Sequence, residues 1–592
     1  MSSSLDFIID NGVLKKYEGN DPFVTVPDGV QEIGARAFWG RSGVKRVFMP
    51  DSVAAIREKA FWDCGNLTEI RFSARLTRIE AAVFRYCNSL TDIFLPDSVT
   101  YLGERAFEGC RGLKAASLSR GIACLKEYTF LDCPSLESVT LPDCLTHIER
   151  SAFDGCTALK TAHLPASLQE VGAFAFARCR SLTAVTGGQG LRTVGDRAFL
   201  GCGSLKSVSL CDGITEIGAS AFEGCLSLES VTVPASVGTL GDFLFKDCKA
   251  LASVTLACRL EELGLGIFSG CGSLESVTMQ DVGVIGTNAF RSCKNLIRVR
   301  LSDSLRELKN GAFADCSRLE ELCLPASLKK IGREALAGCS ALREIEIPDG
   351  VTAQGSGMLE DCTALERAVF RGSADIPAHA LSRCTALREI ILPDTVASMG
   401  EGALEDCVSL TEFTLPAAMR EIPARLFAGC SSLERLSLAG VSVIGANALS
   451  GCEALTELTL PEGLTVIPWG LLLGCTSLRS LRIPSSVVKI EAGAFSGCEG
   501  LTSIDLPDGI REIMWCVFED CSSLESVTLP SALTQLHRRL FYGCTALKSI
   551  RIPTSVREIR DEAFAGCVSL SQLTPPAPDT LLGKDVFAGC PL

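Results

Sequence analysis

The chain has 592 residues, an apolar content of 47% and a formal net charge of −14. A single compact core is not expected at this length, because ordinary cores stop growing at about 250–300 residues. The acidic charge argues against a nucleic-acid-binding protein, which needs a basic stripe to neutralise phosphates, and against docking on anionic membranes. No apolar run approaches the roughly 18 residues of a membrane span, so we expect no membrane insertion.

Residues 1–23 are expected to form an N-terminal capping hairpin. Two apolar runs between Phe7 and Tyr17 flank Asn11 and Gly12, and Asn-Gly is the strongest short hairpin signal. A hairpin here would cover the open end of the first repeat, as a solenoid requires. The segment lacks the basic start, apolar core and cleavage site of a secretory signal. We therefore predict a cytoplasmic protein, with the cell surface or secretion by a non-standard route as the alternative.

A cysteine then recurs along the chain from Cys64 to Cys590, and Arg41 stands where the first would be. Three steps of this ladder are 22 residues and the rest are 23. A fixed period in this range is typical of a solenoid. We expect one continuous array over residues 24–592, with about 25 units and a truncated last unit.

The unit that ends at Cys110 shows the expected elements. Ile93 and Leu95 alternate with an outward Phe94, which is a strand pattern, and Pro96 ends the strand. A second short apolar pair follows. The motif Ala-Phe-x-x-Cys then suits a single helical or 3₁₀ turn.

Two positions near each ladder cysteine vary in an informative way. The residue before the ladder position is Gly in 14 of 25 units and Asp in seven. Glycine suits the stop of a helical turn, and the four exceptions predict that a left-handed backbone is not required in every unit. The exceptions are Tyr86, Arg178, Ser292 and Arg383. The residue three before the ladder position is Phe in 19 units and otherwise Leu, which predicts a local change of curvature where Leu occurs.

The cysteines are expected to be buried thiols. Twenty-four of the 30 share one position in the repeat, whereas disulfide scaffolds belong to small secreted domains that lack a core. Free cysteine behaves as a small apolar residue. The chain has four histidines, in different units, and neither C-x-x-C nor H-E-x-x-H. We therefore predict no metal site, no cofactor and no catalytic residue.

The consensus L-x-x-I-x-L-P-D-S-V-T-x-I-G-x-x-A-F-x-G-C resembles the leucine-rich repeats of the BspA-like family, a 23-residue class, from Val24 to Cys590. The resemblance implies an α/β-type right-handed superhelix with a concave parallel β-sheet. It implies short strands and helical or 3₁₀ turns on the other side. It also implies binding of proteins or extracellular-matrix components, often at bacterial or protist surfaces, and no shared catalytic residues.

Partner-binding candidates come from the outward row of the first strand, seven residues after the ladder position. Most of this row is Ser or Thr, which strand propensity explains. Two patches differ: Phe48, Arg71 and Phe94 in one, and Arg300, Glu346, Val369 and Ile391 in the other. Exposed aromatics with Arg are typical of binding hot spots. The alternatives are packing of the first patch against the hairpin, and a solvated salt-bridged face for the second. The neighbouring outward row adds Arg298, Glu321, Glu344, Arg367 and Glu389.

We therefore predict a non-catalytic protein-binding scaffold that presents an extended concave surface to a macromolecular partner. The alternative is a cell-surface or secreted adhesin that binds host protein or extracellular matrix. An enzyme is a second alternative that the absent motifs disfavour. The array reaches Cys590 without an evident cap. An open sheet edge is a pairing site, so an end-to-end homodimer through this edge is a further hypothesis.

Overall fold

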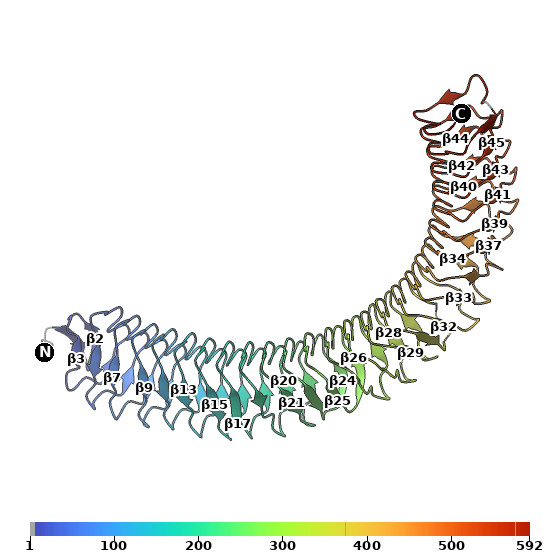
Figure 1. Ribbon diagram of the computed structural model, residues 1–592. Helices are drawn as coiled ribbons and strands as arrows, with labels where there is room; N and C mark the ends of the chain where they lie inside the picture. Colours follow the sequence, from blue (N-terminus) through green and yellow to red (C-terminus); the bar gives the residue numbers. More distant parts are fainter. Residues whose placement is uncertain (1–5, 373–374, 575, 592) are drawn as a thin grey trace. The chain divides into compact units, whose positions relative to one another are not determined.

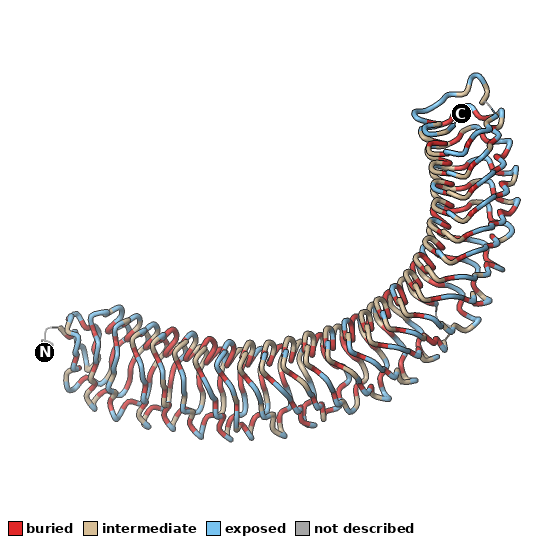
Figure 2. Tube along the Cα trace, in the orientation of Figure 1, coloured by how far each residue is buried: buried red, intermediate tan, exposed pale blue. Residues whose placement is uncertain are grey.

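The computed structural model describes residues 6–372, 375–574 and 576–591, and the chain forms two compact units that divide after Ser302. Each unit is a parallel β-solenoid in which every turn, or rung, takes 22 or 23 residues (Figure 1). Buried positions recur in every rung along both units (Figure 2). The described residues contain no α-helix. The predicted solenoid is thus confirmed.

One side of the rungs carries the longer strands, of two to four residues, paired in parallel with neighbours at the same position of the next rung. In the first unit they are β3 (Phe23–Thr25), β5 (Arg46–Phe48), β7 (Glu69–Arg71), β9 (Asp92–Phe94), β11 (Ala115–Ser117), β13 (Ser138–Thr140), β15 (Thr161–Leu164), β17 (Ala184–Gly187), β19 (Ser207–Val208), β21 (Ser230–Val233), β23 (Ser253–Leu256) and β25 (Ser276–Met279). In the second unit they are β29 (Glu344–Ile347), β31 (Arg367–Phe370), β32 (Glu389–Ile391), β33 (Glu412–Phe413), β35 (Arg435–Leu436), β37 (Glu457–Thr459), β39 (Ser480–Arg482), β41 (Ser503–Asp505), β43 (Ser526–Thr528), β45 (Ser549–Arg551) and β47 (Gln572–Thr574).

A second side carries mostly two-residue strands, also parallel, whose alternate side chains are buried. In the first unit they are β4 (Glu32–Ile33), β6 (Ala55–Ile56), β8 (Arg78–Ile79), β10 (Tyr101–Leu102), β12 (Cys124–Leu125), β14 (His147–Ile148), β16 (Glu170–Val171), β18 (Thr193–Val194), β20 (Glu216–Ile217), β22 (Thr239–Leu240), β24 (Leu260–Leu263) and β26 (Val282–Ile285). In the second unit they are β27 (Glu307–Leu308), β28 (Lys330–Ile331), β30 (Ala353–Gln354), β34 (Glu421–Ile422), β36 (Val443–Ile444), β38 (Val466–Ile467), β40 (Lys489–Ile490), β42 (Glu512–Ile513), β44 (Gln535–Leu536), β46 (Glu558–Ile559) and β48 (Leu581–Leu582).

An antiparallel hairpin of β1 (Phe7–Asp10) and β2 (Val13–Tyr17) precedes the first rung. β2 pairs in parallel with β4, so the hairpin extends the column of short strands. The Tyr17 ring lies 5.1 Å from the Phe38 ring, and the Tyr17 N–H donates to the Ala37 carbonyl at 2.8 Å. The hairpin therefore presents to the first rung the same kind of contacts that one rung presents to the next.

The third side of each rung is a turn segment rather than the predicted helical turn. Its N–H groups alternate between two acceptors: Ala60 donates to Arg57 in its own rung, whereas Phe61 donates to Val83 in the next. A helix would satisfy these donors within the segment. Here half of them join rung to rung, so the segment works as a ladder along the solenoid.

This alternation fixes the backbone at two positions, one and five residues before the ladder position. Both have positive φ in every rung, for example 60° at Lys59 and 61° at Asp63. The prediction that the left-handed backbone is not required everywhere was wrong, since the four exceptions also have φ between 59° and 65°. Tyr86, for example, must turn its N–H toward the Glu108 carbonyl of the next rung, at 2.9 Å, whatever its side chain.

The ladder cysteines from Cys64 to Cys567 are buried thiols, as predicted, and they have a specific role; Cys590, in the last rung, is half-buried. Each ladder cysteine whose hydrogen bond the structure describes donates to the carbonyl of the residue three before the ladder position of the preceding rung, as Cys64 does to Phe38 at 3.0 Å. Burial raises the pKa of Cys64 to about 12. All thirty cysteines are free, and Cys144 and Cys323 are exposed. A small apolar side chain with one weak donor therefore fits this position.

Within the second unit, the longer strands β37, β39, β41 and β43 lie along the outer side of the bend, and the turn segments follow the inner side (Figure 1). The family resemblance had implied a concave sheet. Rungs diverge toward the outer side, and the longer strands there pair only in groups of two to four. The turn segments keep their hydrogen bonds from rung to rung.

Candidate functional site

The outward face of the longer-strand sheet has hollows where neighbouring strands are not paired. A hollow of about 770 Å³ lies between β7 and β9, and one of about 980 Å³ between β35 and β37. A third, of about 460 Å³, lies between residues 321–324 and β29. Where two neighbouring strands are not hydrogen-bonded, their backbone groups and the flanking side chains are accessible to a ligand.

Arg46, Arg71 and Phe94 line the first hollow, and Phe23 and Phe48 are the strand-register partners of the two arginines. We call these five residues the Phe94 patch. Phe48 and Arg71 are partners in the strand register, and Arg71 and Phe94 both line the hollow. Phe94 is 69% exposed, so the hairpin does not cover it, and Phe48 is half-buried. The structure thus brings together the three residues that the sequence predicted for this patch.

Two members of the Phe94 patch were not found from the sequence. Phe23 is 55% exposed, and the Arg46 guanidinium lies 5.4 Å from its ring centre while pairing with Glu69 at 3.2 Å. Both belong to the outward row five residues after the ladder position, next to the row from which the sequence prediction was made. Applying the repeat spacing to this second row near the N-terminus would have identified them. Arg71, in contrast, has no ion pair or ring contact among the described residues. Its charge is therefore available to a partner.

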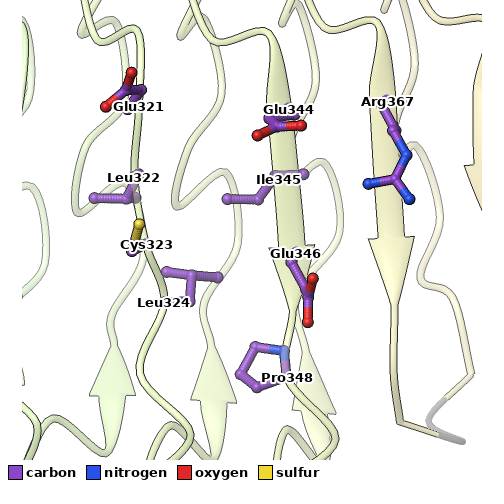
Figure 3. A pocket seen from close by; sticks show the side chains of 9 residues that line it. All are labelled: Glu321, Leu322, Cys323, Leu324, Glu344, Ile345, Glu346, Pro348 and Arg367. Atoms are coloured by element: carbon purple, nitrogen blue, oxygen red, sulfur yellow. The ribbon is translucent and has the colours of Figure 1, made fainter.

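The hollow beside β29 is lined by four charged side chains, Glu321, Glu344, Glu346 and Arg367, and by the thiol of Cys323. We call these five residues the Glu346 patch. Glu321, Glu344 and Arg367 form a row at one end, and Leu324 and Pro348 lie at the other (Figure 3).

Ion pairs neutralise part of the Glu346 patch. Arg371 donates to Glu346 at 3.0 Å and holds the pKa of that carboxyl below its usual range. Arg367 donates to Glu389 at 2.8 Å. Glu344, in contrast, has no ion pair among the described residues, so its charge is available to a partner.

The remaining residues predicted for partner binding differ in exposure and location. Val369, expected to face the solvent, is 1% exposed. It lies in register between Glu346 and Ile391, and we attribute its burial to the Arg371 side chain, which reaches back to Glu346 beside it. Ile391 is 37% exposed. Arg300 is exposed and belongs to the first unit, so it is not part of the Glu346 patch.

The four histidines lie in four different rungs. His163 contacts the Thr186 hydroxyl at 3.1 Å, and His379 lies 3.7 Å from Glu405. Among the described residues, no group of three or more His, Cys, Asp or Glu side chains is arranged to hold a metal ion. In the same part of the chain, no helix is long and apolar enough to span a membrane.

The repeat frame matches a known family. The family description "BspA type Leucine rich repeat region (6 copies)" matches residues 16–136, 78–202, 123–252, 170–296, 261–375, 370–476 and 470–592. The chain belongs to the BspA-type leucine-rich repeat family. No curated protein matches the chain.

Several solved structures are similar to this BspA-type protein. A leucine-rich repeat protein from Bacteroides ovatus is 24% identical, over 77% of this chain and 93% of its own, with a TM-score of 0.41. One from Eubacterium ventriosum is 20% identical, over 55% and 88%, with a TM-score of 0.33. A leucine-rich cell surface protein from Faecalibacterium prausnitzii is 19% identical, over 96% and 92%, with a TM-score of 0.20.

Proposed function

We propose that this BspA-type protein is a non-catalytic scaffold that binds a protein partner through the outward face of its longer-strand sheet, with the Phe94 patch as the main anchor. The observation that carries the proposal is the exposure of Phe94, at 69%, beside an unpaired Arg71 at an open hollow. Large aromatic and arginine side chains around a pocket dominate the binding energy of protein interfaces.

The solenoid supports such a surface because the core and the outward row are independent. Ile93 and Leu95 are buried, whereas Phe94 between them is exposed. The backbone is fixed by the neighbouring rungs, so the anchor side chains lose little freedom on binding. The Glu346 patch adds a charged surface in the second unit, which contributes to partner choice and association rate more than to affinity.

The test compares affinities for a partner isolated by affinity capture with the whole chain. Arg71→Ala/Phe94→Ser is expected to weaken binding of the purified partner at least tenfold by surface plasmon resonance. Thr232→Ser lies in the same outward row, among its serine and threonine positions. It is the matched control and should bind as the wild type does. Equal affinities for the anchor variant and the control would contradict the assignment of this surface.

A further inference from the structure

Two tryptophans stand at the same position, six residues before the ladder position, in rungs of the second unit that are two apart. Trp469 and Trp515 are 50% and 49% exposed, and Ala492 occupies this position in the rung between them. At about 4.8 Å per rung their backbones are roughly 10 Å apart. We call these two residues, with the 38% exposed Leu473, the Trp surface.

The Trp surface is held on rigid backbone. The Trp469 N–H donates to the Glu491 carboxylate at 3.1 Å, and the Trp469 and Trp515 carbonyls accept from neighbouring rungs at 2.8 and 3.1 Å. Ala492 is only 5% exposed, whereas alanines at this position elsewhere, such as Ala35 and Ala446, are exposed or half-buried. We attribute the difference to the flanking indoles.

These indoles differ from the other aromatic side chains near the turn segments. Elsewhere such a ring has a cation of the chain itself over it: Arg36 lies 4.7 Å from Trp39, Arg105 lies 4.4 Å from Tyr128 and Arg539 lies 3.9 Å from Tyr542. Among the described residues, no lysine, arginine or other ring lies over Trp469 or Trp515. Their π faces are therefore available to a cation from another molecule.

The charge of these rungs favours such a cation. Between Val443 and Cys521 the chain has ten acidic and four basic residues, against a net charge of −14 for all 592. Glu491 and Glu512 are close to the tryptophan rungs, and Lys489 neutralises them only in part, at 4.0 and 3.4 Å. A negative surface attracts and orients a basic partner.

We propose that the Trp surface binds a basic segment of a protein partner, with arginine or lysine side chains stacked on the two indoles. This surface is separate from the sheet face of the proposed function. An apolar segment or a neutral ligand could contact the tryptophans but would gain nothing from the surrounding acidic residues. The negative charge of these rungs therefore favours a basic segment.

A fluorescence titration tests the proposal, because the chain has only four tryptophans. Trp39→Phe/Trp62→Phe leaves Trp469 and Trp515 as the reporters. A synthetic decapeptide of alternating arginine and glycine is expected to change their emission saturably, and the change should weaken at least tenfold in 0.5 M salt. Glutamate–glycine and leucine–serine decapeptides of the same length should have no effect. Absence of saturation with the arginine peptide at millimolar concentration, or equal binding of the leucine peptide, would overturn the proposal.

Calorimetry with the same arginine peptide separates stacking from general attraction to an acidic protein. Trp469→Ala/Trp515→Ala should bind at least tenfold more weakly than the wild type. Trp39→Ala/Trp62→Ala, whose rings carry their own cations, is the matched control and should bind normally. Unchanged affinity of the first variant would show non-specific electrostatic binding instead. Arg71→Ala/Phe94→Ser should retain full peptide binding, so failure of this proposal and failure of the sheet-face proposal are distinguishable.

Discussion

The two units have the same rung geometry but different interiors on the turn side. In the first unit all twelve rungs have phenylalanine three before the ladder position, and their rings stack at 4.7–5.7 Å. In the second unit six rungs have leucine there: Leu336, Leu359, Leu381, Leu404, Leu449 and Leu472. The comparison teaches that inter-rung hydrogen bonds set the geometry, since they continue unchanged through the leucine rungs.

The two units also differ in residue type at the left-handed position that lies five residues before the ladder position. In the first unit Gly266 is the one glycine there, whereas the second unit has glycine at Gly311, Gly357, Gly402, Gly470 and Gly493. Aromatic stacking adds about 0.5–1.5 kcal/mol per pair beyond the burial of area. Side chains forced into left-handed backbone oppose this by about 1–2 kcal/mol each. The first unit is thus more tightly coupled and more strained, and the second is looser.

The largest expected effect is on thiol reactivity, which reports both units residue by residue. Burial raises the pKa of Cys64 to about 12, so at pH 8 almost no thiolate is present, and Cys64 should alkylate about a thousandfold more slowly than a free cysteine with a pKa of about 8.5. The other buried ladder cysteines should also label slowly, and the exposed Cys323 should label first. Mass spectrometry after iodoacetamide treatment measures this. As the urea concentration rises, the cysteines of the leucine-containing rungs should become alkylated at lower urea than the cysteines of the first unit. Simultaneous labelling would contradict the difference in coupling.

Truncation of a stacked ring should be the most destabilising substitution. Phe153 is fully buried between Phe130 and Phe176, at 5.4 and 5.0 Å, so Phe153→Ala should lower the free energy of unfolding by about 3–5 kcal/mol. Leu404→Ala is the counterpart in the second unit and should lose about 2–4 kcal/mol. Urea denaturation followed by circular dichroism measures both. A larger loss for Leu404→Ala would reverse the ranking of the units.

A methyl group at a left-handed glycine should cost less. Gly155 and Gly474 have φ of 77° and 74°, so alanine at either should lose about 1–2 kcal/mol from backbone strain. A Cβ at Gly155 would also lie 2.4 Å from the Asp132 carboxylate, whereas at Gly474 the nearest atom is 4.0 Å away. Gly155→Ala should therefore be the more destabilising of the two in the same denaturation assay. Equal losses would show that Asp132 moves aside freely.

The smallest expected effect is a gain. Ser292→Gly removes a side chain held at φ 60° and should stabilise the protein by about 0.5–1 kcal/mol. Arg383→Gly in the second unit should gain less, because Arg383 also pairs with Glu360 and Asp361, both at 2.6 Å. Thermal unfolding resolves the two variants. Destabilisation by Ser292→Gly would mean that the serine side chain stabilises the folded state by more than the left-handed backbone strain destabilises it.

Much of the fold was predictable because periodicity reports it directly. The ladder spacing, the alternation around Phe94 and the burial of the cysteines follow from a pattern that repeats in every rung. The turn segment was not predictable, because Ala-Phe-x-x-Cys satisfies a helical spacing equally well. What decides between them is the set of N–H groups that donate to the next rung, as Phe61 does to Val83, and the acceptors of this set lie 22 residues away.

The candidate sites were predictable only in part. Arg71 and Phe94 could be placed together because register follows from the repeat. The burial of Val369 could not be predicted, because we attribute it to the direction that the Arg371 side chain takes toward Glu346, which the repeat pattern does not specify. The Trp surface was also missed, because the exposure of Trp469 and Trp515 depends on the folded arrangement of neighbouring rungs, whereas the cation over Trp39 is Arg36 of the same rung.

Within each unit, the alternating donors of the turn segments give successive rungs the same backbone hydrogen-bonding pattern. Cutting out the stretch between two ladder cysteines would leave ends that meet the same acceptors and the same kind of thiol as before. Such a molecule is modular in the strict sense: its span can grow or shrink by whole increments while its interior stays the same. Evolution by tandem duplication, or an engineer adding copies, could thus adjust its reach independently of what it recognises.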